Sequence, residues 1–228
     1  MTTDVLTLDL TESLDIVDEW LSFYVAQPHE QIGRPGAVCP FVAPARRVNA
    51  IKTVVRLVGP AAGLPLLAEV IRCSLDEFEQ ADWSATNPSL RSLLVVLPDL
   101  PRGAYPLFDE AHALVKSESV ERGLMIGQFH PECPEPAARN PSFLVSRSPV
   151  PLVAVRAMAI HDIFFLAERA EWFDEYRRRF GGRHRRQAKN IDPVLTAHYR
   201  KALALHQRSD DPDPSRAGNP TAVSEPTA

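Results

Sequence analysis

The sequence lacks the motifs on which several large enzyme classes depend. Its 228 residues contain neither G-x-G-x-x-G nor G-x-x-x-x-G-K-[ST], so no glycine loop is present to bind a dinucleotide or a nucleoside triphosphate. The G-x-S-x-G turn that presents the nucleophile of α/β hydrolases is missing as well. Dehydrogenase, kinase and hydrolase functions are therefore unsupported.

Cysteines and long apolar runs are also scarce. Cys39, Cys73 and Cys133 cannot all pair, which argues against a disulfide scaffold. No apolar run reaches the roughly 18 to 20 residues that a membrane helix needs, and the acidic N-terminus has no basic segment typical of a secretory signal. The net charge of −4 attracts neither nucleic acid nor an anionic membrane. We therefore expect a cytoplasmic protein that does not bind membranes.

The first half of the chain alternates between two hydrophobic periods. Apolar residues spaced by a helical period predict helices at residues 11–26, with Thr11 as N-cap, and at 63–81 and 105–119. Short apolar runs that end in Gly, Pro or a polar residue predict strands at residues 51–58, 90–97 and 123–129. This order predicts an α+β (or α/β) fold, in which helices pack on a small mixed sheet of about three to four strands.

The second half begins with a proline-rich stretch. Six prolines fall between residues 131 and 151, where we expect an irregular path without helix or strand. The apolar segment 150–169 should pack a helix on the sheet, and a helix at 171–180 should end at Gly181-Gly182. A last helix at 191–207 would complete a single globular domain over residues 10–207, and residues 209–228 should form a disordered tail.

His130 is the first candidate for a functional residue, because it follows the predicted strand at 123–129 directly. Open sheets place functional groups at such strand ends. Arg139, Arg147 and Arg156 follow, and their guanidinium groups can hold a carboxylate in a fixed fork. We expect Arg147 to face the same cavity as His130. The alternative is that His130 and the arginines only form structural hydrogen bonds, and that Cys39 is an ordinary buried residue.

Zinc is a second interpretation of the same region. The segment His130-Pro131-Glu132-Cys133 is similar to the H-x-E half of zinc deaminases, but the P-C-x-x-C pair of those enzymes is missing. A zinc site would have to combine His130, Cys133 and the distant Cys39.

Several short strings occur here in a fixed order: CPF at 39–41, GQFHP at 127–131, RNP-x-F at 139–143 and SRSP-x-P at 146–151. Over residues 20–180 this pattern resembles a bacterial family of domains of unknown function. A second uncharacterised bacterial family has a similar order of CPF, FHP and RSP-x-P. More remotely, the arrangement is similar to the YqcI/YcgG-type haem proteins, some of which N-oxygenate amino acids or guanidines in natural-product pathways.

The resemblance to haem proteins implies a noncovalent haem, because the sequence has no C-x-x-C-H attachment motif. His130 would be the axial ligand, with a Cys39 thiolate and His161 as rivals, although His161 more plausibly pairs with Asp162. The arginines would hold the haem propionates or a substrate carboxylate. The residues expected to form the apolar wall are Phe129, Phe143, Leu152, Met158, Phe164 and Phe165.

The function expected from this is a haem- or metal-dependent oxidative enzyme, an (N-)oxygenase, of bacterial secondary metabolism. It would act on an amino-acid-like small molecule and would need an electron donor. The alternative is a non-catalytic binding module that contacts nucleic acid or a protein through residues 177–186. That segment has six arginines, without which the net charge would be −10. No recognisable nucleic-acid-binding element accompanies it, so we expect a solvated helix end and no specific nucleic-acid partner.

Overall fold

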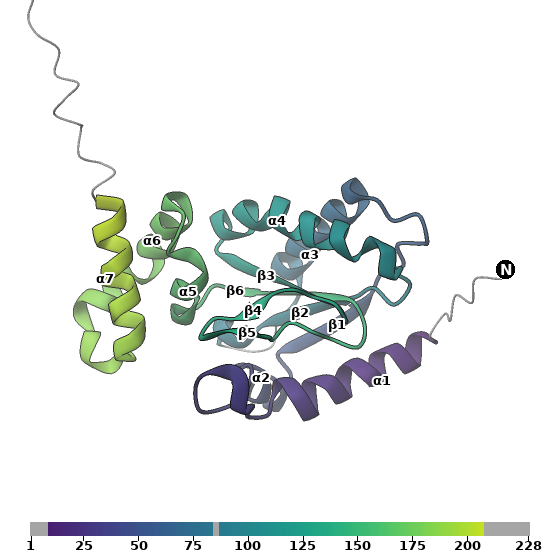
Figure 1. The fold of residues 1–228 in the computed structure, drawn as a ribbon, viewed down its shortest axis with the longest axis horizontal. Coiled ribbons are helices and arrows are strands. Elements are labelled where there is room, and N and C mark those ends of the chain that lie inside the picture. The colour runs from purple at the N-terminus through teal and green to yellow at the C-terminus, as the bar shows by residue number, and fades with distance from the viewer. Residues whose placement is uncertain (1–8, 84–86, 208–228) are drawn as a thin grey trace, which may run out of the picture.

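A computed structural model describes residues 9–83 and 87–207 (Figure 1). Its centre is a four-stranded sheet in the order β1-β2-β6-β3, with β1 and β2 parallel and β6 antiparallel to both of its neighbours. The strands are β1 (Ile51–Val55), β2 (Ser92–Val96), β3 (Leu124–Phe129) and β6 (Leu152–Ala157). The predicted single α+β domain with a small mixed sheet is confirmed.

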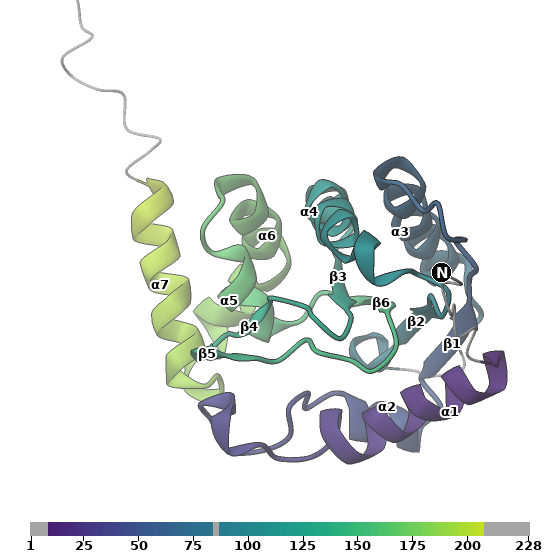
Figure 2. The ribbon, with the colours of Figure 1, turned by 45° about the vertical axis from the view of Figure 1, so that its right-hand side comes forward.

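Helices cover both faces of this sheet (Figure 2). One face packs on α3 (Leu64–Gln80) and α4 (Tyr105–Glu121). The other packs on α1 (Leu10–Trp20) and on the π-helical segment η1 (Leu21–Val25) that continues it. The helix predicted at residues 11–26 is therefore confirmed, but its N-cap is Asp9, whose carboxylate accepts from the Thr11 N–H.

Strand β6 corrects the prediction for residues 150–169, where a helix was expected. Val153 and Val155 point into the core beneath α3 and α4, whereas Leu152 and Ala154 face α1. A short apolar run that is buried on both faces has no period that separates strand from helix, so the sequence pattern was ambiguous there. The helical part comes later, as the 3₁₀ turn Ile160–Asp162 and the short helix α5 (Ile163–Leu166).

The proline-rich stretch is more regular than expected. It contains a two-stranded hairpin of β4 (Pro136–Ala137) and β5 (Asn140–Leu144). Because each strand of such a pair has a free edge, a proline can sit there without breaking a ladder hydrogen bond. Between η1 and β1 the chain forms the 3₁₀ turn Glu30–Ile32 and α2 (Val42–Arg47). The remaining 3₁₀ turns are Pro88–Leu90, Arg102–Ala104 and Ala188–Asn190.

The C-terminal helices form a second core beside the sheet. Helix α6 (Ala170–Arg186) runs through Gly181-Gly182, so the predicted end at these glycines is wrong. A Cβ on Gly181 would lie 3.0 Å from the Tyr199 hydroxyl, so the glycine lets α7 (Pro193–Gln207) approach closely. Phe173 and Tyr176 of α6 fill the space between the two helices and α5. The tail predicted for residues 209–228 lies outside the described residues.

Within residues 9–83 and 87–207, no helix combines the length and the apolar character needed to cross a membrane.

Val153→Ala tests the central place of β6. The variant removes methyl groups from a fully buried site, so the free energy of unfolding in urea should fall by about 2 kcal/mol. Val48→Ala, at the exposed end of α2, is the matched control and should change stability by less than about 0.5 kcal/mol. Equal effects of the two substitutions would contradict the position of β6.

Candidate active site

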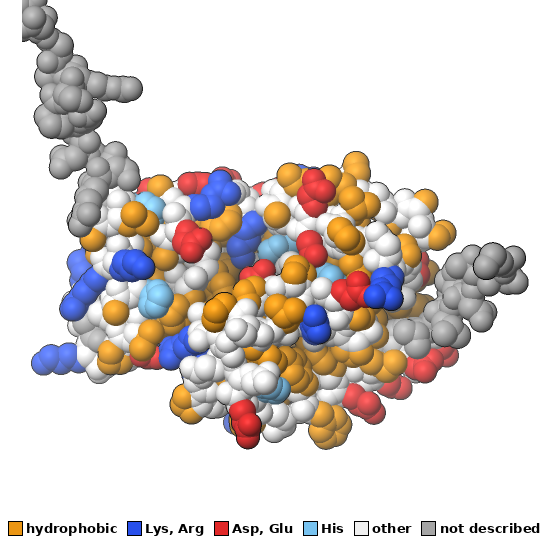
Figure 3. Space-filling model, viewed as in Figure 1, with side chains coloured by type: hydrophobic (Ala, Val, Ile, Leu, Met, Phe, Trp, Pro, Cys, Tyr) orange, Lys and Arg blue, Asp and Glu red, His pale blue; other side chains and the backbone are white. Residues whose placement is uncertain are grey.

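Two adjoining cavities open beside strand β3. The apolar cavity, about 280 Å³, lies over the α1 face of the sheet and continues around the edge strand to α4. The polar cavity, about 340 Å³, lies between the loop before α2, the β4–β5 hairpin and α5. They share the wall residues Val38, Cys39, Phe41, Val145, Arg156 and Phe165, and we call the two together the cleft. Figure 3 shows the surface hollowed between the C-terminal helices and the sheet.

Lys116 is the most unusual side chain of the cleft. It comes from α4, lines the apolar cavity and is only 9% exposed. Burial lowers the pKa of its amine from 10.5 to about 8, and the positive charge of Arg156 acts in the same direction. Within the described residues, the amine has no hydrogen-bond or ion-pair partner, and its nitrogen is not fully enclosed but opens to the cavity.

Two more ionisable groups line the same cavity. His112 lies one helical turn before Lys116, and its Nε2–H donates to the Ile126 carbonyl over 3.2 Å. Burial lowers the pKa of His112 to about 4, so its ring is neutral at physiological pH. Glu135 lies where the chain enters the hairpin, and partial burial raises the pKa of its carboxyl although solvent reaches it. An amine, an imidazole and a carboxyl of shifted pKa thus share one largely apolar wall.

Arg156 and Arg139 line the cleft, and each could bind a ligand carboxylate with its guanidinium group. Both guanidinium groups already form ion pairs with carboxylates of the protein. Arg156 binds both oxygens of Asp162 at 2.8 and 2.5 Å. Arg139 binds Asp192 at 3.1 Å, and its guanidinium lies over the ring of Phe164. These arginines therefore have partners before any ligand arrives.

Arg147 lies elsewhere. Its side chain is exposed, and it lines neither cavity, so the expectation that it shares a cavity with His130 is not met. Its neighbours Ser146 and Ser148 are both buried.

His130 also lies outside the cleft, on the α4 side of the sheet. Its ring is 1% exposed and packs against Tyr105, with ring centroids 4.5 Å apart. Nε2–H donates to Asp109 at 3.0 Å, and Nδ1 accepts from the Glu132 N–H at 3.3 Å. Phe129 lines the apolar cavity, so the next side chain along the strand points away from it. Neither nitrogen of His130 has a free lone pair for an iron in this arrangement.

Donor atoms of Asp109, His130 and Cys133 lie within 4.8 Å of one another, which is close enough for three metal ligands. His130 and Cys133 therefore lie close together, as the zinc interpretation required, but the third nearby donor is Asp109 and not Cys39. Burial raises the pKa of the Cys133 thiol to about 11, which favours a neutral hydrogen-bonded group. A zinc-bound histidine usually donates its second N–H to an acceptor, whereas Nδ1 of His130 here receives a hydrogen bond.

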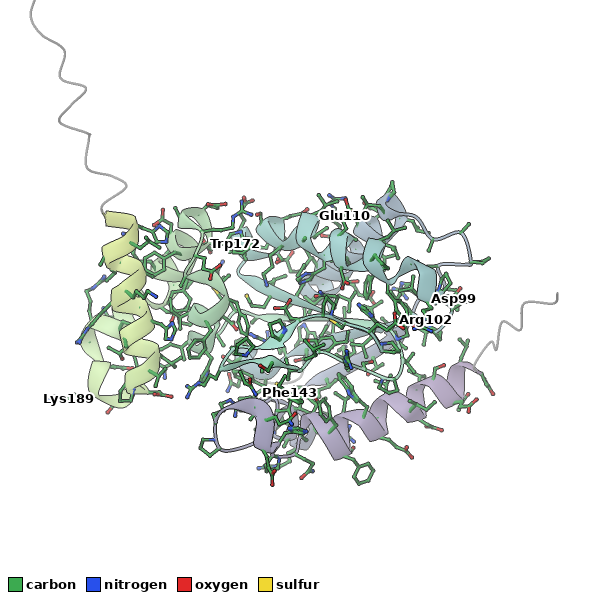
Figure 4. The ribbon with its side chains drawn as sticks, viewed as in Figure 1. Asp99, Arg102, Glu110, Phe143, Trp172 and Lys189 are labelled. Carbon is green, nitrogen blue, oxygen red and sulfur yellow. The ribbon has the colours of Figure 1, made fainter. Side chains whose placement is uncertain are left out.

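Phe129, Leu152 and Phe165 line the apolar cavity as expected for an apolar wall, and Phe164 lines the polar one. Cys39 is part of both. His161 lines the polar cavity, but its predicted partner Asp162 binds Arg156 instead. Met158 belongs to the core of the C-terminal helices. Phe143, labelled in Figure 4, stacks on the ring of His29 at a centroid distance of 4.4 Å.

Lys116, His112 and Glu135 were not among the candidate residues predicted from the sequence. The available signal was the spacing of His112 and Lys116, which places two ionisable groups on one helical face. Glu135 comes from a segment without any periodic pattern.

The comparisons with known proteins bear on the family only. A family model described as "Domain of unknown function (DUF6875)" matches residues 14–191. Neither the search of curated proteins nor the search of solved structures found a match. The match agrees with the uncharacterised family that the motifs indicated, whereas the likeness to haem proteins stays a prediction.

The low pKa of His112 makes the free energy of unfolding depend on pH in the acidic range. The unfolded chain binds a proton at this ring near pH 6.5 and the folded chain only near pH 4, so stability falls as the pH drops between these values. From pH 7 to pH 5 this group alone should lower the free energy of unfolding by about 2 kcal/mol.

His112→Gln retains a donor for the Ile126 carbonyl and does not titrate. Urea unfolding at pH 7 and pH 5 should therefore show a smaller difference between the two pH values for this variant than for the wild type. His206→Gln, which replaces a ring that donates to the Ala167 carbonyl, is the control and should retain the wild-type difference. An unchanged pH dependence in His112→Gln would refute the burial of a neutral ring.

Proposed function

The chain belongs to the family described as domain of unknown function (DUF6875), and because this membership assigns no activity, we propose a function from the cleft. We infer an enzyme of small-molecule metabolism whose substrate has an apolar body and a polar reacting end. The observation that carries this proposal is the unpartnered amine of Lys116 in the wall of the apolar cavity.

Several features support catalysis rather than structure at this amine. A buried, unpartnered amine opposes folding, so its presence is better explained by chemistry than by stability. Groups of shifted pKa in an apolar cavity are typical of active sites, because proton transfer is efficient when a pKa lies near the working pH. Lys116 is partly neutral at physiological pH and can accept a proton, and the carboxyl of Glu135, whose pKa burial raises, lines the same cavity.

The shape of the cleft supports a small-molecule substrate. Leu21, Phe129 and Leu152 give the apolar cavity walls that would hold a hydrocarbon or aromatic body. The polar cavity begins at Cys39 and Arg156 and could receive a second polar end, such as that of an amino acid.

The binding-module alternative has less support. Three of the six arginines in residues 177–186 pair with acidic residues of their own helix: Arg177 with Asp174 at 2.8 Å, and Arg178 and Arg179 with Glu175 at 2.6 and 2.5 Å. Such pairs are typical of a solvated helix face. The absence of a specific nucleic-acid partner remains our prediction.

Lys116→Met tests whether the amine serves function at the expense of stability. The pKa of Lys116 is lower in the folded chain than in the unfolded chain, so the unfolded chain binds the proton more tightly. This difference lowers the free energy of unfolding, and the loss is complete below about pH 8. Removal of the amine should raise the free energy of unfolding at pH 7 by about 3 kcal/mol. Lys201→Met, at an exposed site on α7, is the control and should have little effect.

The same variants test binding in the cleft. Anilinonaphthalene sulfonate combines an aromatic body with one anionic group, and its fluorescence should report binding to the folded wild type. Lys116→Met, and Ala154→Phe which fills the apolar cavity, should each weaken this binding by about tenfold, whereas Lys201→Met should not. Unchanged binding in both cleft variants, or a destabilised Lys116→Met, would argue against the proposal.

Oxidative chemistry with haem remains a second candidate function. One observation favours it, with Cys39 in place of His130 as the ligand of the iron. Cys39 lines both cavities, and Arg34 and Arg156 lie near it. Cys39 would hold the haem iron through its sulfur, and Phe129 and Leu152 would contact the porphyrin. When bound, haem would supply the oxidative chemistry on an amino-acid-like substrate and would require an electron donor.

A visible spectrum separates the two candidate haem ligands. If haem binds at Cys39, protein purified from haem-supplemented cells should show a Soret band, which Cys39→Ser should abolish or shift and a folded His130→Ala should retain. A Soret band that is lost in His130→Ala and retained in Cys39→Ser would identify His130 as the ligand. A colourless protein that takes up no added haem would refute the haem hypothesis. Stoichiometric zinc that is lost in Cys133→Ser would identify a zinc site instead.

A further inference from the structure

We propose that Lys116 is a nucleophile that forms an imine with an aldehyde or ketone substrate bound in the apolar cavity. This inference rests on the proposed function, because it places the substrate's reacting carbonyl group in the same cavity. It goes further by naming the bond that forms and the class of substrate.

The first support is the position of Lys116 relative to the other lysines. The chain has four lysines, and Lys116 alone lines either cavity of the cleft. Lys52 lies over the ring of Trp83 at 5.4 Å, and Lys201 is exposed on α7. Figure 4 shows Lys189 at the outer end of the C-terminal helices, remote from the sheet. One amine is therefore presented to an enclosed space, and the others face solvent or another side chain.

The second support is the charge around the amine. Asp162 and Glu135 favour the protonated form, but Asp162 is bound on both oxygens by Arg156 and on one of them also by the Ala159 N–H. Arg156 and burial favour the neutral form, and the ring of His112 adds no charge at neutral pH. Burial is the largest of these effects and lowers the pKa to about 8, so a fraction of the amine is neutral near physiological pH, as in other lysines activated by an apolar pocket.

This balance separates a nucleophile from an anchor for anions. A lysine that binds a carboxylate works best fully charged, with a high pKa, and is usually exposed or paired. A buried amine that loses its proton near pH 8 keeps part of its charge at physiological pH, and its neutral fraction has a lone pair free for attack at carbon.

The reaction needs no oxidant or reductant. The lone pair of the amine attacks the carbonyl carbon, and the nitrogen gives up one proton to the oxygen, which leaves a carbinolamine. Glu135, in its protonated form, donates a proton to the hydroxyl group; the C–O bond breaks, and water leaves. The product is a protonated imine that retains one N–H, together with a Glu135 carboxylate and one water.

Trapping by reduction tests the inference. Benzaldehyde and phenylpyruvate carry an aromatic body and a carbonyl group, and borohydride converts an imine into a stable secondary amine. Incubation of the folded protein with either probe and borohydride should give one adduct by intact mass, and peptide mapping should place it on Lys116. Its formation at pH 7.5 should be at least about tenfold faster than at Lys52, Lys189 or Lys201. Lys116→Met should form no adduct at this rate, whereas Lys201→Met should react like the wild type.

The result that overturns the inference is an adduct distributed equally over the four lysines, or none on Lys116 with either probe. Displacement of anilinonaphthalene sulfonate separates this failure from that of the proposed function. If the probes displace the dye but do not modify Lys116, the cleft binds such molecules and the imine is wrong. If the dye does not bind in the cleft at all, the proposed function fails with it. Slower trapping in Glu135→Gln, with dye displacement retained, would support Glu135 as the proton donor.

Discussion

The ion pair between Arg156 and Asp162 fixes the geometry on which the rest of the cleft depends. Arg156 lies on β6 in the middle of the sheet, and Asp162 is buried in the turn that leads to α5. The carboxylate accepts both arms of the guanidinium and the Ala159 N–H, so its charge is compensated and the turn is held in one shape. This turn directs α5, and with it Phe165, to the wall shared by the two cavities.

The same ion pair explains why Lys116 is chemically distinct. If Asp162 were free, its charge would hold the nearby amine in the protonated form. Because Arg156 neutralises it, Lys116 faces a cavity without a committed counter-ion, and burial determines its protonation. The energetic penalty, about 3 kcal/mol, is a sizeable fraction of the stability of a typical domain. The burial of apolar side chains in the cores on both faces of the sheet must offset this loss of stability.

Local pattern predicted much of the fold and little of the site. The elements at residues 51–58, 63–81, 90–97, 105–119 and 123–129 were correct because each has a helical period or is a short apolar run that ends in Gly, Pro or a polar residue. Strand β6 was missed because it lies in the longer apolar segment 150–169, where no such signal separates the strand from the short helix that follows it. His130 was expected in a cavity because it follows a strand, but alternation turned it toward α4, where Asp109 holds it. The set of Lys116, Glu135 and Arg156 comes from three separate elements, and only the packed sheet brings them to one wall.

The central claim is that the amine of Lys116 is buried and free of a counter-ion in the cleft. The direct measurement is the pKa of each lysine amine by NMR of lysine labelled with ¹³C and ¹⁵N, which is tractable because the chain has only four lysines. Lys116→Met assigns its signal. The account predicts one amine that titrates near pH 8, with its signal lost in that variant. A Lys116 signal that titrates at 10.5 or above would show a solvated or ion-paired amine and would contradict the account.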